Sequence, residues 1–209
     1  MARFMQAAAL LAALIGVSAC SGAKQALELY DRATEFNRIE DVNDSLGATT
    51  AAEVAALSGT AIYTGQAGFG GEIDTTNNVV ISAPMTLQAD FDRLTVEGEI
   101  TEMMVSELTD SEIADLRAGR ARISTILKSG KNAEGTIELA GDIAGGAITA
   151  TTSGTARTSD HTYGLSGEVA GTFRGSNGAG IALDETDSFT VTQDGDAIKR
   201  SIFQAELER

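Results

Sequence analysis

From about residue 58 onward, apolar and polar residues alternate along the chain, which is the pattern of a strand with one buried face. The alternation is most regular over residues 85–100, where it is interrupted only by Asp92-Arg93. If these two residues form a tight turn, the apolar residues on both sides fall on one face of a hairpin. The facing pairs are then Phe91 with Leu94 and Ala89 with Val96. The spacing therefore predicts a β-hairpin with a fixed register.

The same alternation returns in five later segments. Their inward-facing positions are Ile137, Leu139, Gly141 and Ile143; Ile148, Ala150 and Thr152; Tyr163, Leu165, Gly167, Val169, Gly171 and Phe173; Ala179, Ile181 and Leu183; and Phe189 with Val191. Asp194-Gly195 is a typical hairpin turn. A last strand over about 197–207 can bury either Ile198 and Ile202 or the set Phe203, Ala205 and Leu207, and we favour the second set.

About eight strands with short connections and one apolar face each predict a mainly β fold. The arrangement that fits is a single eight-stranded, antiparallel, up-and-down β-barrel with a filled interior, because closure removes exposed strand edges. A two-sheet sandwich is the alternative. An eight-stranded transmembrane barrel also alternates, but it needs aromatic girdles, and this chain has no Trp, 3 Tyr and 7 Phe.

Helical spacing is confined to two regions. Ala26, Leu27, Tyr30, Ala33, Phe36 and Ile39 predict an amphipathic helix over about 24–39, either docked on the barrel or acting as a spacer. Residues 40–50 are polar and rich in residues that are typical of turns. Thr50 with Glu53, and Thr109 with Glu112, have the spacing of capping boxes. They predict a brief helical turn up to residue 57 and a short helix over about 110–118, stopped at Gly119.

The first 20 residues contain an apolar run too short to span a bilayer, which has the length of a secretory signal. The run ends in Val17-Ser18-Ala19-Cys20, which resembles the lipobox of bacterial lipoproteins. The resemblance implies cleavage before Cys20 and acylation of that residue, for instance with palmitate, which holds a protein stably on a membrane. An ordinary signal peptide cleaved after Ala19 is the alternative. Ser21, in place of Asp, favours sorting to the outer membrane.

These features divide the chain into three parts. Residues 1–19 are the expected lipoprotein signal peptide, residues 20–57 a tether with short helices, and residues 58–209 the barrel. The chain has 15 Lys and Arg against 30 Asp and Glu, and loss of Arg3 with the signal leaves 14 against 30, a net charge of −16. Such a surface repels nucleic acids and anionic lipids. Cys20 is the only cysteine, so stability must come from the core, and we expect a monomer.

Candidate reactive groups are sparse. His161 is the only histidine; with Ser159 or Ser166 it could serve as a general base, but the chain has no GxSxG elbow, and we expect a solvated loop residue. The acidic segments 184–187 and 194–196 could offer oxygens to Ca²⁺ but lack EF-hand spacing. The glycine-rich segment 175–180 predicts a tight turn and not a phosphate loop. We therefore expect no cofactor, no metal site and no enzymatic activity.

Several segments together resemble the transferrin-binding protein B-like family of barrels, which includes factor H binding protein. They are Leu87-Gln-Ala-Asp-Phe-Asp-Arg-Leu-Thr-Val-Glu-Gly-Glu-Ile100, Gly167-Glu-Val-Ala-Gly-Thr-Phe-Arg-Gly-Ser-Asn-Gly-Ala-Gly-Ile181, Ser58-Gly-Thr-Ala-Ile-Tyr-Thr-Gly65 and Ser201-Ile-Phe-Gln-Ala205. The resemblance covers about residues 58–207, without a separate handle domain. It implies an eight-stranded barrel tethered through Cys20 whose ligand is another protein.

The expected function is a non-enzymatic surface binding module on an outer-membrane lipoprotein, in protein capture or in metal or haem acquisition. A structural lipoprotein facing the periplasm, without a diffusible ligand, is the alternative, and a hydrolase is a third. The one functional residue that the sequence indicates is the acylated Cys20, which attaches the protein to the membrane. The sequence indicates no ligand-binding residue.

Overall fold

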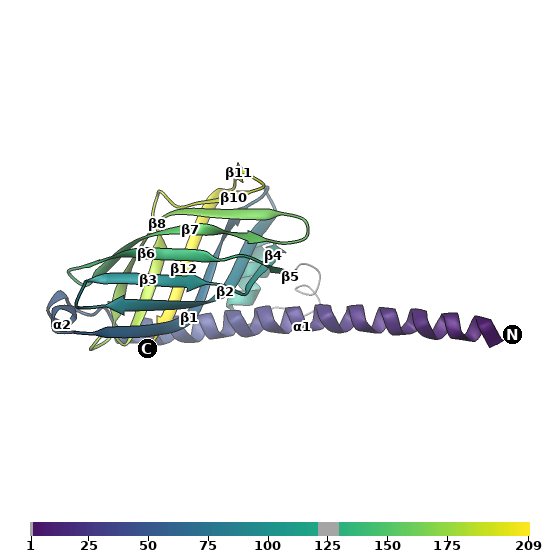
Figure 1. Ribbon diagram of the computed structural model, residues 1–209, viewed down its shortest axis with the longest axis horizontal. Coiled ribbons are helices and arrows are strands. Elements are labelled where there is room, and N and C mark those ends of the chain that lie inside the picture. The colour runs from purple at the N-terminus through teal and green to yellow at the C-terminus, as the bar shows by residue number, and fades with distance from the viewer. Residues whose placement is uncertain (1, 121–129) are drawn as a thin grey trace.

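Eight strands form a closed antiparallel barrel (Figure 1). The computed structural model describes the backbone of residues 2–120 and 130–209 and the side chains of residues 24–120 and 130–209. In chain order the barrel strands are β1 (Thr60–Glu72), β2 (Asn78–Asp90), β3 (Thr95–Ile100), β6 (Ile137–Ala144), β7 (Ala147–Arg157), β8 (Thr162–Arg174), β9 (Gly180–Glu185) and β12 (Lys199–Glu208). Each pairs with the next, and β12 pairs with β1. The predicted fold class is confirmed.

The β2–β3 hairpin has the predicted register. Ala89 lies opposite Val96 and Met85 opposite Ile100. The prediction for Leu94 was wrong, because this residue has a left-handed backbone, with φ of 58°. Its side chain is 47% exposed at the turn instead of facing the interior.

Inward-facing side chains fill the barrel. The largest are Tyr63, Phe69, Tyr163, Phe173 and Phe203, each at most 1% exposed. The hydroxyl of Tyr63 donates a hydrogen bond of 2.8 Å to the carbonyl of Gly178, so its polar end is satisfied inside the core. Strand β12 buries the predicted set of Phe203, Ala205 and Leu207.

Four shorter strands extend the wall at one end of the barrel: β4 (Met103–Leu108), β5 (Lys131–Ala133), β10 (Thr190–Gln193) and β11 (Asp196–Ala197). Strand β4 pairs with the first residues of β2, beyond the end of β3. In the same way, β10 pairs with the first residues of β8, beyond the end of β9. The sequence pattern does not predict β4, because it is buried on both faces and therefore does not alternate. Met103 and Val105 join the barrel core, whereas Met104 and Leu108 contact the helices outside.

The helices in the described part of the chain are α1 (Ala2–Leu46), α2 (Ala51–Ala55) and α3 (Asp110–Arg117). Both predicted capping boxes are present, at the starts of α2 and α3. Helix α1 was predicted to end near residue 39, and it continues to Leu46 because Ile39 and Asn43 are buried against the barrel. It stops at Gly47, whose φ of 69° is left-handed. In the described part of the chain, no helix has the length and apolar character needed to cross a membrane.

Candidate functional site

Helix α1 lies along the outer wall of the barrel from residue 24 onward, mainly over β1 and β12 (Figure 1). The buried residues on its apolar face include Ala26, Leu29 and Ile39. Leu27, predicted to belong to that face, is 52% exposed, and Leu29, which the prediction omitted, is 1% exposed. The face is therefore rotated relative to the predicted one. Helix α3 lies beside α1 and packs on it through Leu116.

A mostly apolar groove remains between α1, α3 and the outer wall of the barrel, with a cavity volume of about 120 Å³. Its apolar walls are formed by Leu29, Ala33 and Phe36 of α1, Ile113 and Leu116 of α3, and Ile202 of β12. Gly68 of β1 also lines it, and a Cβ atom built there would meet nothing within 4 Å. The missing side chain of Gly68 thus helps to keep this space open.

Polar groups hold the walls of the groove together. Arg32 of α1 donates a hydrogen bond of 2.7 Å to the carbonyl of Ser82 and forms an ion pair with Glu28. Asn37 donates to the carbonyl of Arg117, over 2.8 Å, which joins α1 to the end of α3. These contacts fix both helices on the barrel.

The side chain of Arg117 also lines the groove. Its Nη2 atom donates a hydrogen bond of 2.9 Å to Oε1 of Gln204 on β12. Two further polar atoms among the lining residues, Oε1 of Gln66 and Oγ of Ser82, are buried without a hydrogen-bond partner in the described structure. The groove therefore combines apolar walls with a few polar groups, the usual composition of a small-ligand site.

Further along α1, the contact with the barrel is polar and includes carboxylates. Asn43, 1% exposed, donates a hydrogen bond of 2.6 Å to Oε2 of Glu206. Burial raises the pKa of Glu206 to about 7, although the hydrogen bond from Asn43 and the charge of Arg174 oppose the shift; Glu40 and Asp184 reinforce it. Burial also raises the pKa of Glu40, against the nearby charge of Arg117. We therefore expect the stability of this part of the α1 contact to depend on pH.

Cys20 lies within α1, and its side chain falls outside the described side chains. Its acylation therefore remains a prediction. Among the α1 residues whose side chains are described, from residue 24 onward, Ala26 is the first that is buried, six positions after Cys20. At about 1.5 Å of rise per residue, these residues are separated by about 9 Å along the helix axis.

His161 lies in the connection between β7 and β8, with its side chain 34% exposed. Its Nδ1 atom is 2.7 Å from Oδ2 of Asp194. The backbone N–H of Thr162 and the His161 ring lower the pKa of Asp194. In the described structure neither Ser159 nor Ser166 forms a hydrogen bond with His161, so the pair is not extended to a nucleophile.

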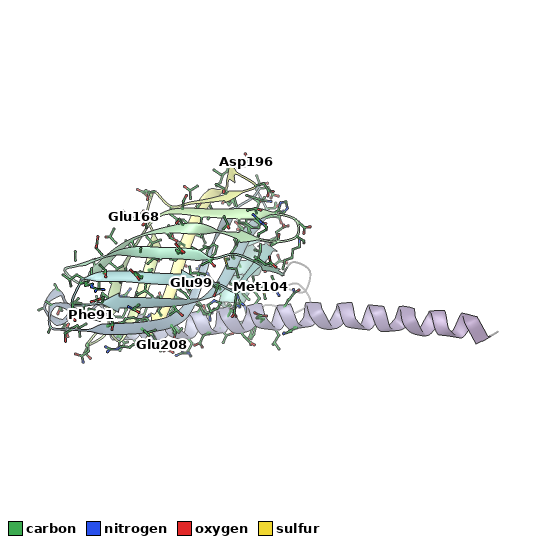
Figure 2. The ribbon with its side chains drawn as sticks, in the orientation of Figure 1. Phe91, Glu99, Met104, Glu168, Asp196 and Glu208 are labelled. Atoms are coloured by element: carbon green, nitrogen blue, oxygen red, sulfur yellow. The ribbon has the colours of Figure 1, made fainter. Side chains whose placement is uncertain are left out.

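The other candidate segments have structural partners. Glu185 accepts a hydrogen bond from the backbone N–H of Phe203, and Asp196 begins β11, where it lies opposite Gln193 of β10 (Figure 2). The glycine-rich segment 175–180 is the turn between β8 and β9, and it bonds to Gly47 and Tyr63. Within the described residues, no group of three or more His, Cys, Asp or Glu side chains is arranged for a metal ion.

The groove could not be predicted from the sequence. Gly68, Arg117 and Ile202 are far apart in the chain, and none carries a motif. The apolar face of α1 was the one available signal, because it predicted that the helix could dock on the barrel. No protein-family model matches this chain, and no curated protein matches it either.

Proposed function

We propose that this protein is a bacterial outer-membrane lipoprotein, anchored through Cys20, whose barrel is a non-enzymatic binding module. The observation that carries the proposal is the position of the groove. Side chains fill the inside of the barrel, whereas the groove lies outside it, beneath the helix that leads to Cys20. A ligand would therefore bind at the side of the barrel and not inside it.

The short connection between Cys20 and the docked part of α1 supports a location close to the membrane. Only about 9 Å of helix separates Cys20 from Ala26. The likeness of several strands to the transferrin-binding protein B-like family supports a surface role, and a protein ligand remains part of this proposal. Capture of a metal or haem carrier is the more specific form of it.

Intact mass of the protein purified from its own membrane tests the anchor. We expect cleavage before Cys20 and the added mass of acyl chains. A Cys20→Ser variant should lose the acyl mass and leave the membrane fraction. A wild-type protein without lipid would contradict the proposal.

Protease treatment of whole cells tests surface exposure, with a periplasmic protein as the control for an intact outer membrane. We expect digestion of this protein while the control survives. An acylated protein that resists digestion in whole cells, but not in lysed cells, would instead favour the periplasm-facing structural role.

A further inference from the structure

We propose that the groove between α1, α3 and the barrel binds a small aliphatic carboxylic acid, with the alkyl group in the groove and the carboxylate at Arg117. This inference goes beyond the proposed function, because it assigns a small-molecule site in addition to the proposed protein ligand, and it rests on that function only in treating the protein as a binding module.

The size and lining of the groove fit a short alkyl group. An engineered apolar cavity of about 150 Å³ holds one benzene, which has six carbons. A cavity of about 120 Å³ is therefore large enough for about five carbons. The walls are mainly aliphatic, and the open space above Gly68 provides room at the floor. Burial of methylene groups against Leu29, Leu116 and Ile202 would supply the apolar part of the binding energy.

Arg117 supplies the charge complementarity. In the described structure no carboxylate oxygen lies within 4 Å of its guanidinium group, which donates one hydrogen bond to the neutral side chain of Gln204. Glu40 on α1 is close enough for the positive charge of Arg117 to lower its pKa, but the two side chains form no ion pair in the described structure. Several other arginines of this acidic protein are paired with acids, namely Arg32, Arg38, Arg93, Arg120 and Arg200.

The guanidinium group of Arg117 has five N–H donors in a planar fork, and among the described residues only Gln204 accepts a hydrogen bond from it. A carboxylate matches that fork in shape and charge. A carboxylate at the mouth of an aliphatic groove is therefore the ligand feature that this combination of side chains fits. An alcohol of the same length would fill the groove but lack the charge.

Binding of hexanoate tests the proposal, because this acid has five carbons beyond its carboxyl carbon. The experiment uses the full chain carrying Cys20→Ser, followed by isothermal titration and by NMR shifts of groove residues. We expect saturable binding with a Kd on the order of 1 mM. 1-Hexanol should bind about tenfold more weakly, since it cannot pair with Arg117.

Two arginine variants provide a matched comparison. Arg117→Gln should weaken hexanoate binding about tenfold, while Arg120→Gln, which removes an arginine paired with Asp115 outside the groove, should change it less than about twofold. The unfolding midpoint of each variant confirms that it is folded. Equal effects of the two substitutions, or equal affinity for hexanoate and 1-hexanol, would overturn the assignment of the carboxylate to Arg117.

Filling the groove tests the position of the alkyl group. Gly68→Val places a larger side chain in the groove and should abolish hexanoate binding. If that variant does not fold, Ala33→Leu fills the groove from α1 instead and should have the same effect. Retained binding in a folded variant, or no saturable binding by the Cys20→Ser chain, would overturn the proposal. Because this chain cannot be acylated, the result is independent of the mass and protease experiments on the membrane anchor.

Discussion

Adding a methyl group to either of two glycines under α1 should change stability in opposite directions. A methyl group on Gly68 would enter open space, whereas one on Gly180 would collide with the Oδ1 atom of the buried Asn43. Gly68→Ala should therefore raise the free energy of unfolding by about 1 kcal/mol, because it restricts the unfolded chain and fills space. Gly180→Ala should lower it by about 1–3 kcal/mol by forcing Asn43 away. Urea denaturation measures both, and equal effects of the same sign would contradict this account of the α1 contact.

Thr152 is a polar residue inside the barrel. It is 2% exposed, and its hydroxyl group has no hydrogen-bond partner in the described structure. Thr152→Val keeps the shape and removes the unpaired hydroxyl, so it should stabilise the protein by about 1 kcal/mol. Thr149→Val, at an exposed position of the same strand whose hydroxyl group forms no hydrogen bond in the described structure, is the control and should change stability by less than about 0.5 kcal/mol. A destabilised Thr152→Val variant would indicate that the hydroxyl does have a partner.

At the scale of elements, sequence patterns succeed where each strand has one face in the core and one in water. The β2–β3 hairpin and strand β12 were predicted with their inward residues for this reason. Strand β4 was not predicted, because Met103 and Met104 are buried on opposite faces. The C-terminal part of α1 was not predicted either, because its polar Asn43 is buried by a tertiary contact that local sequence does not reveal.

The contact between α1 and β12 should weaken as the pH rises. The pKa of Glu206 is raised from 4.5 to about 7 in the folded protein, so the folded state holds its proton more tightly than the unfolded state. Its contribution is most favourable below about pH 4.5 and is lost as the pH rises to about 7. A full shift of that size would correspond to about 3 kcal/mol. Solvent screening of a half-exposed carboxylate reduces the expected effect to about 1 kcal/mol.

Glu206→Gln tests this pH dependence, because glutamine resembles the protonated acid. The variant should match the wild type near pH 4.5 and be about 1 kcal/mol more stable at pH 8. Glu208→Gln is the matched control: it removes an exposed carboxylate that pairs with Arg38 and should give no stabilisation at pH 8. Denaturation across the pH range provides the measurement, and parallel curves for wild type and Glu206→Gln would contradict the shift.

At the scale of the whole molecule, the barrel could be predicted from the sequence and the groove could not. The barrel follows from a repeated local pattern, since each strand has its own alternation and closure removes the free edges. The groove exists only where α1 and α3 pack beside three barrel strands around Gly68, and no local sequence pattern specifies that arrangement. The absence of a motif for binding in the sequence is therefore compatible with a ligand site built entirely by packing.

The excess of negative charge acts on the whole molecule and should make stability depend on salt. Glu99 and Glu168 lie on the outer wall (Figure 2), and Glu99 lies directly opposite Glu138 across the β3–β6 pair. Such like-charged neighbours are destabilising. Salt shortens the range of this repulsion from about 30 Å at 0.01 M to about 8 Å at 0.15 M. The unfolding midpoint should therefore rise by a few degrees over this range, as measured by circular dichroism.

Two substitutions separate local repulsion from net charge. Glu138→Gln removes one charge from β6 and with it the repulsion from Glu99 on β3. Asp142→Asn also removes one charge from β6, but Asp142 lies opposite the neutral Thr95. At low salt, Glu138→Gln should raise the unfolding midpoint more than Asp142→Asn does, by an amount equivalent to about 0.5 kcal/mol in the free energy of unfolding. It should also reduce the salt dependence of the midpoint more than Asp142→Asn does. If the two variants behave alike, net charge alone governs stability. If the midpoint of the wild type falls as salt is added, attractive pairs such as Arg38 with Glu208 outweigh the repulsion across the outer wall.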